Sequence, residues 1–272
     1  VTVGEGKVIG GARFEDTKGF SAGAAYVFDA ATGKQLHKLI ASDGNDLDEL
    51  GGAVAIRDGV IAVGADGDTN QNGTFAGAVY LFDAATGQQL RKLFSLDGTT
   101  SQRFGNDVAM ENGLVIIAAD GDDAFGLHRG AVYIYHVASG RELQKITPDP
   151  AGDWTDFGQS ISVRDGVIAV GAGFLSFEQE ARVYFYGTAT GTPLGQIIDT
   201  RSASFAWDVA LSVGLGVAGS PFEGTTGASF GSAYLFDATI DDAECPGDTD
   251  GDNDVDLQDL LRVLGAFGSQ CD

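Results

Sequence analysis

Six aspartates lie close together near the end of the chain, in the segment 248–259, which reads DTDGDNDVDLQD. Calcium binds six to eight hard oxygens, and closely spaced carboxylates and carbonyls supply them. Five of the six fall at positions 1, 3, 5, 9 and 12 of a twelve-residue calcium loop, and position 7 is expected to offer its backbone carbonyl. The alternative is a solvated acidic tail. We predict a Ca²⁺ site formed by Asp248, Asp250, Asp252, Asp254, Asp256 and Asp259.

The residues after this loop favour a helix, because apolar side chains recur at helical spacing from 257 to 267. The segment before the loop, 241–247, is too short and polar for an entering helix. A calcium loop followed by one helix resembles one half of a dockerin module, with its EF-hand-type loop. Dockerins carry two such halves and this chain carries one. The resemblance implies docking to a protein partner.

The chain has two cysteines, Cys245 and Cys271, and they bracket the predicted loop and helix. A disulfide closing a loop of this size would contribute roughly 3–4 kcal/mol through the entropy of the unfolded chain. The alternative is two free thiols. We predict the disulfide, and with it an oxidising compartment outside the cell.

Signals for catalysis are weak. Asp107 and Asp208 stand just before the first strand of their repeats, and a suitably separated pair of carboxylates can hydrolyse glycosides. Asp-rich loops that begin at Asp66 and Asp120 could hold further calcium. In both cases we favour structural or solvated carboxylates, and we expect the protein not to be an enzyme.

The composition excludes several classes of protein. Acids outnumber bases 39 to 16, for a net charge of −23, whereas nucleic acids and anionic membranes both attract a basic face. No apolar run approaches the roughly 18 residues of a membrane span. Acids are dense after residue 240, so we expect one domain over 1–240 and a calcium-binding tail over 241–272.

The first 240 residues repeat a pattern of about 50 residues five times. Strings such as GAVYLFDAATGQQL begin at Gly23, Gly77, Gly130, Ala181 and Gly231. A second string, such as LGGAVAIRDGVIAVGA from Leu50, recurs between them. Each full copy reads as four short strands, and such repeats are typical of propeller blades. We predict an all-β fold, a five-bladed β-propeller of four-stranded antiparallel blades.

The motifs that carry a family resemblance are Phe104-Gly105 and Phe157-Gly158, with Gly64-Ala65 and Gly171-Ala172. They resemble the FG-GAP repeats of bacterial surface proteins and of the integrin α-subunit propeller. The resemblance implies an extracellular or cell-surface protein, made with a signal segment that this chain does not show. Integrin-type blades often carry calcium in the first turn, but here that turn is as short as Arg57-Asp58-Gly59. That calcium site is therefore not expected.

The fifth repeat runs from its third strand directly into the tail, so the last blade is expected to lack its outer strand. An unpaired strand edge invites the addition of another strand. A missing segment, the tail or a neighbouring subunit could fill it, and the last would give a head-to-tail oligomer or fibre. The predicted assembly edge comprises Gly231, Ser232, Ala233, Tyr234, Leu235 and Phe236.

These features together predict a calcium-stabilised structural or interaction protein that assembles with itself or docks to a partner. An adhesion module that binds a protein or a glycan through the propeller face is the alternative. A glycoside-active enzyme is a further alternative, and the residues favour it less.

Overall fold

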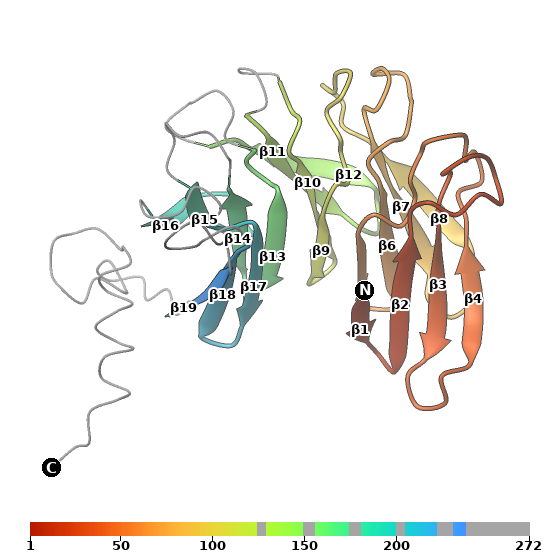
Figure 1. The fold of residues 1–272 in the computed structure, drawn as a ribbon, viewed down its shortest axis with the longest axis horizontal. Coiled ribbons are helices and arrows are strands. Elements are labelled where there is room, and N and C mark those ends of the chain that lie inside the picture. The colour runs from red at the N-terminus through yellow and green to blue at the C-terminus, as the bar shows by residue number, and fades with distance from the viewer. Residues whose placement is uncertain (124–128, 149–155, 174–180, 200–204, 222–230, 238–272) are drawn as a thin grey trace, which may run out of the picture. The chain divides into compact units, whose positions relative to one another are not determined.

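The computed structural model describes residues 1–123, 129–148, 156–173, 181–199, 205–221 and 231–237 (Figure 1). These residues form five antiparallel sheets, and in each the strands lie in sequence order. The first four sheets have four strands and the fifth has three. No helix occurs in the described ranges, and so none there could span a membrane. The predicted series of four-stranded sheets is confirmed, and so is the shorter last one.

The first sheet consists of β1 (Thr2–Gly4), β2 (Lys7–Ala12), β3 (Ala24–Asp29) and β4 (Gln35–Leu39). The second has β5 (Val54–Arg57), β6 (Val60–Ala65), β7 (Ala78–Asp83) and β8 (Gln89–Leu93). The third has β9 (Val108–Glu111), β10 (Leu114–Ala119), β11 (Ala131–His136) and β12 (Arg141–Ile146). The fourth has β13 (Ser160–Arg164), β14 (Val167–Ala172), β15 (Ala181–Gly187) and β16 (Pro193–Asp199). The fifth has β17 (Asp208–Ser212), β18 (Leu215–Ser220) and β19 (Ser232–Asp237).

The turn between the first two strands of a sheet has the chemistry expected of a tight hairpin. In the second sheet, Asp58 and Gly59 have φ values of 52° and 73°. A two-residue type I′ turn needs positive φ at both central positions, which Asp-Gly and Asn-Gly adopt readily. Asn112 and Gly113 do the same in the third sheet, with φ values of 49° and 74°.

The glycines of the repeated motif are required by close backbone contact between neighbouring sheets. A Cβ atom at Gly64, at the end of β6, would lie 2.1 Å from the carbonyl oxygen of Gly105. The N–H of Gly105 in turn donates to the carbonyl of Ala118. Gly64 and Gly105 therefore allow the start of one repeat to lie against the preceding sheet.

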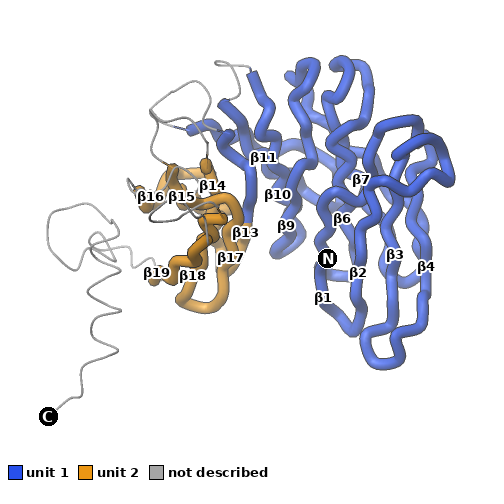
Figure 2. The backbone as a smooth tube through the Cα atoms, viewed as in Figure 1, with its two compact units in different colours: residues 1–161 blue, residues 162–272 orange. Residues whose placement is uncertain are grey.

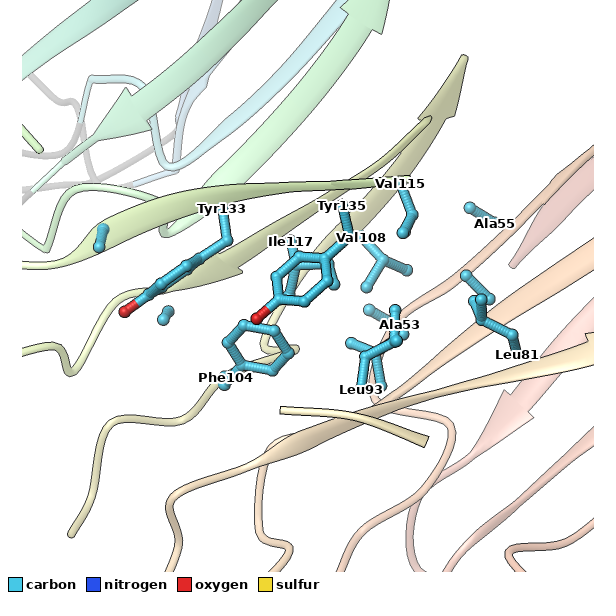
Figure 3. Close-up of a cluster of buried hydrophobic side chains, with 14 residues drawn as sticks. Ala53, Ala55, Leu81, Leu93, Phe104, Val108, Val115, Ile117, Tyr133 and Tyr135 are labelled. Carbon is cyan, nitrogen blue, oxygen red and sulfur yellow. The ribbon is translucent and has the colours of Figure 1, made fainter. Parts of the chain in front are cut away.

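In the second sheet, the third strand contributes to two hydrophobic cores. On β7, Val79 and Leu81 pack in a cluster that includes Phe104 and Tyr133 of the next repeat (Figure 3). Tyr80, which points the other way, packs in a cluster shared with the first sheet. Burial on both faces explains why these strands are continuous apolar runs. The fourth strands are half polar, as expected for an outer position.

The chain divides into two compact units, residues 1–161 and 162–272 (Figure 2). In the first unit β1 packs beside β5, and β5 beside β9. In the second unit β14 packs beside β17, and a separate core includes Phe185, Phe205 and Phe236. Sheets that pack face to face in this way fit a β-propeller.

Candidate functional site

The second sheet carries a cluster of charged and hydrogen-bonding side chains. Tyr80 on β7 lies opposite Lys92 on β8. The Tyr80 hydroxyl and the Lys92 ammonium lie 2.9 and 2.8 Å from the carboxylate of Asp68, in the loop after β6. They lie at the same distances from Asp43, in the connection between β4 and β5. We call this arrangement the Tyr–Lys–acid cluster, and it joins four segments of the chain.

The third sheet repeats the Tyr–Lys–acid cluster. The Tyr133 hydroxyl lies 2.8 Å from Asp122 and 3.1 Å from Asp97. The Lys145 ammonium donates to the same carboxylates, at 3.0 and 2.8 Å. Gln102 adds a bond to Asp122 through its side-chain amide, at 2.7 Å. In both copies, the ammonium group of a partly buried lysine lies between two carboxylates.

The first and fourth sheets depart from this arrangement. In the first, Lys38 donates to Glu15 at 2.8 Å and to Thr17 at 2.6 Å, and Glu15 follows β2 as Asp68 follows β6. In the fourth, Tyr184 lies opposite Gln196, which carries no charge. The full cluster with two acids is therefore a feature of the second and third sheets.

Electrostatics fix the charges of the cluster at neutral pH. Burial opposes the charge on Lys92, but its hydrogen bonds to Asp43 and Asp68 outweigh that effect and raise its pKa. Burial likewise opposes the charge on Asp43, yet Lys92 and Tyr80 lower its pKa. Burial and the nearby carboxylates raise the pKa of Tyr80 far above its ordinary value. The paired charges of Asp43 and Lys92 thus favour the closed cluster, which works as a clasp between the loops that carry Asp43 and Asp68.

Asp48, beside the Tyr–Lys–acid cluster, has a pKa closer to neutral pH than an ordinary aspartate. It is only 2% exposed, and the N–H of Asn45 donates to its carboxylate at 2.7 Å. Burial raises the pKa of Asp48 to about 6, and the charge of Asp68 adds to the effect, while the bond from Asn45 opposes it. This carboxyl therefore titrates near neutral pH, in contact with the loop that carries Asp43.

A second set of ion pairs links the first three repeats. Arg13 contacts Glu49 and Asp66, the latter at 3.2 Å. Arg103 contacts Asp66 at 3.0 Å and Asp120 at 2.8 Å. The Asp-rich loops after β6 and β10 therefore direct their carboxylates to arginines and lysines of the protein. Within the described ranges, no three His, Cys, Asp or Glu side chains converge on a possible metal position.

The carboxylate of Asp107 is used to join backbone segments. It accepts the N–H of Val108 at 2.8 Å and the N–H of Ile161 at 2.8 Å. This is the structural role favoured over the glycosidase interpretation. Asp208, the first residue of β17, belongs to the other compact unit and is exposed.

One end of the sheets in the first unit presents large apolar side chains to solvent. In each sheet the loop after the second strand and the connection after the fourth strand emerge at the same end, because the strands are antiparallel. Phe14, Phe20 and Phe75 lie in the former loops, and Leu96 in a connection; Phe14 is 68% and Leu96 is 78% exposed. We call these four residues the loop surface.

The fifth sheet exposes residues that are buried in the complete sheets. Its last strand, β19, pairs with β18 along one edge, and in the described residues no strand pairs with the other edge. Leu235 is 51% exposed, and Ala233, which points the same way, is also exposed. Phe236, on the opposite face, is buried in the core of its unit. Five of the six residues of the predicted assembly edge, from Ser232 to Phe236, lie on β19, and their role in assembly stays a prediction.

The predicted calcium loop, Asp248 to Asp259, lies outside the described residues. Cys245 and Cys271 lie outside them as well. The calcium site and the disulfide therefore stay predictions.

Sequence reasoning missed the Tyr–Lys–acid cluster, although a signal was present. Lys38, Lys92 and Lys145 each follow the repeated tyrosine by twelve residues. In the fourth repeat the same spacing leads to Gln196. A charge that recurs at one position of a repeat could have been matched with the acids of the preceding loops.

The model of the FG-GAP repeat matches two segments, residues 34–82 and 88–135. Each runs from the outer strand of one sheet to the third strand of the next. These two segments are similar to FG-GAP repeats. FG-GAP repeats are typical of extracellular and cell-surface proteins, and proteins built from them are generally not enzymes.

Two computationally designed proteins are among the similar solved structures. Ika4 is 14% identical, with a TM-score of 0.49 over 74% of this chain and 98% of its own. Ika8 is 16% identical, with a TM-score of 0.46 over 80% of this chain and 66% of its own. No curated protein matches the sequence.

Proposed function

We propose that this protein is an extracellular interaction protein that assembles with itself, or with a partner, through its last sheet. FG-GAP repeats, a net charge of −23 and a basic complement of only 16 Lys and Arg support a role outside the cell and away from nucleic acids.

The observation that carries the proposal is the exposure of β19. A strand with an open edge can add a further strand by main-chain hydrogen bonds. Leu235 and Ala233 would add an apolar contact beside that edge. A contact between this edge and a different surface of a second copy would be heterologous, and repeated contacts of that kind form chains or fibres.

We also propose that the tail takes part and that calcium orders it. The loop formed by Asp248, Asp250, Asp252, Asp254, Asp256 and Asp259 would hold one Ca²⁺, with a Cys245–Cys271 disulfide around it. Calcium would then promote assembly by ordering a segment that follows β19 directly.

The test is light scattering on the full chain over a wide range of concentration, with calcium and with a chelator. We expect the mass to rise with concentration, more so with calcium. Leu235→Lys should hold the protein monomeric, because a lysine on an edge strand opposes pairing. Leu194→Lys is the matched control, since Leu194 is an exposed leucine on β16 of the same unit. A monomer under every condition would refute assembly.

A second candidate is adhesion through the loop surface, to a protein or a glycan. Its support is the exposure of Phe14, Phe20, Phe75 and Leu96, because apolar groups gathered at one end of a molecule mark interaction sites. An array of polysaccharides, probed with the native chain and with Phe14→Ser/Phe20→Ser, tests the glycan form. Binding that the double variant loses would support it, and binding that survives would exclude the loop surface.

A further inference from the structure

A groove of about 430 Å³ lies between the second and third sheets, at the end where the Asp58-Gly59 turn lies. Both sheets belong to the first compact unit. Its volume is in the range of small-molecule sites, about 300–1,000 Å³. The floor is apolar, with side chains from Leu81, Met110, Leu114 and Val137, and Leu90 also lines the groove.

Two arginines border this floor. Arg91, on β8, reaches across the groove and donates to the carbonyl of Ala138, in the turn of the third sheet. Arg57, at the end of β5, is exposed. Only 16 of the 272 residues are Lys or Arg, so two guanidinium groups beside one apolar groove set it apart from the acidic surface.

The junction between the first and second sheets has different residues at the positions that line this groove. There Glu5 stands where Asp58 stands here, and its carboxylate accepts the N–H of Gly59 at 3.1 Å. Gly4 takes the place of Arg57, and its backbone lies close under Ile56. At that junction, therefore, the carboxylate of Glu5 bonds across to the second sheet, and the branched side chain of Ile56 packs against Gly4.

At the second junction these three residues are replaced by ones that favour a ligand. Asp58 is one carbon shorter than Glu5, Arg57 adds a positive charge, and Met110 replaces Ile56. Methionine is unbranched and adapts its shape to what it contacts. Leu90 remains half exposed above the floor.

We propose that this groove binds an amphipathic carboxylate, such as a medium-chain fatty acid. The alkyl chain would lie on Leu90, Met110 and Leu114. The carboxylate would pair with Arg57 and Arg91, since guanidinium groups bind carboxylates with two parallel hydrogen bonds. This site is independent of the assembly edge and of the loop surface.

The test is a fluorescence titration of the full chain with 11-(dansylamino)undecanoate. We expect saturable binding of one probe per chain, and displacement by decanoate. Decanol, which has the chain but no charge, should displace the probe about tenfold less well, the usual size of a lost charge-assisted bond. Displacement by decanol as effective as that by decanoate would refute recognition of the carboxylate.

Variants locate the binding. Arg57→Ser should weaken it about tenfold, because one guanidinium is lost. Leu90→Glu should abolish it, because it places a carboxylate above the floor. Leu36→Glu is the matched control, at the same repeat position on β4, and should leave binding unchanged. Binding unaffected by both groove variants, or absent from the native chain, would overturn the proposal.

Discussion

The second and fifth sheets contain nearly the same third strand in two different surroundings. β7 reads AVYLFD and β19 reads SAYLFD, and Leu81 and Leu235 occupy the same position in them. Leu81 is 1% exposed and Leu235 is 51% exposed. The residue type is the same, so the neighbouring elements must decide its burial.

The packing of β7 shows which neighbours matter. Leu81 lies in a core that the next repeat supplies, through Phe104, Val108 and Tyr133. Tyr80, on the other face, lies in the core shared with the preceding sheet. On β19 the face of Phe236 packs in a core shared with the preceding sheet, as the Tyr80 face of β7 does. No described residue buries Leu235. The third strand of a repeat thus has two apolar faces, and each is buried only where an adjacent sheet covers it.

The largest expected difference is between alanine substitutions at these two leucines. Leu81→Ala should lower the free energy of unfolding by about 2–5 kcal/mol, because it leaves a cavity in a closed core. Leu235→Ala should lower it by less than about 1 kcal/mol, because the side chain is half solvated already. Urea unfolding of both variants, at a concentration where the protein is monomeric, measures the two values.

Equal costs at the two positions would contradict this account of burial. They would mean that Leu235 is covered in solution, by another part of the chain or by another molecule. Repeating the measurement at higher protein concentration separates these two cases, since only the second depends on concentration.

The next effect concerns the lysine of the Tyr–Lys–acid cluster. Lys92→Met should cost about 2–4 kcal/mol, because it leaves Asp68 buried without its positive partner. Gln196→Met, at the same position of the fourth sheet, should cost less than about 1 kcal/mol. Gln196 carries no charge, so its loss leaves no buried acid without a positive partner. Urea midpoints of the two variants make the comparison, and a tolerated Lys92→Met would refute the clasp.

Much of the fold could be predicted because its signals are local. The Asp58-Gly59 turn and the apolar β6 and β7 follow from short stretches of sequence, and so do the three strands that the described residues give the fifth sheet. The repeat then multiplied each signal, so that five copies supported one interpretation.

The candidate sites could not be predicted in the same way, because their residues come together only in three dimensions. Asp43, Asp68, Tyr80 and Lys92 belong to four segments, and an Asp-rich loop looks the same whether a lysine or a calcium ion meets it. The groove depends on the replacement of Glu5 by Asp58, a change that looks conservative until the bond from Gly59 is known.

A smaller effect should come from Asp48, and it should depend on pH. Its pKa is raised to about 6 in the folded protein, so the neutral carboxyl favours the fold and the charged form opposes it. The stabilisation is therefore complete below about pH 4 and is lost as the pH rises through 6. Asp48→Asn should raise stability by about 2–3 kcal/mol at pH 8 and leave it nearly unchanged at pH 4. Urea unfolding at both pH values tests this, and a gain of equal size at pH 4 would assign the effect to packing instead of charge.

The smallest effect compares the tyrosines of the complete and incomplete clusters. The Tyr80 hydroxyl lies 2.9 Å from both Asp43 and Asp68, so Tyr80→Phe removes a bond to a charged acceptor and should cost about 1–2 kcal/mol. Tyr26 is only partly buried, with Lys38 near its ring, and Tyr26→Phe should stay within about 0.5 kcal/mol. Thermal unfolding resolves this difference. If Tyr26→Phe proved as costly as Tyr80→Phe, an acid from outside the first sheet would have to reach Tyr26, which would place a covering partner on that sheet as well.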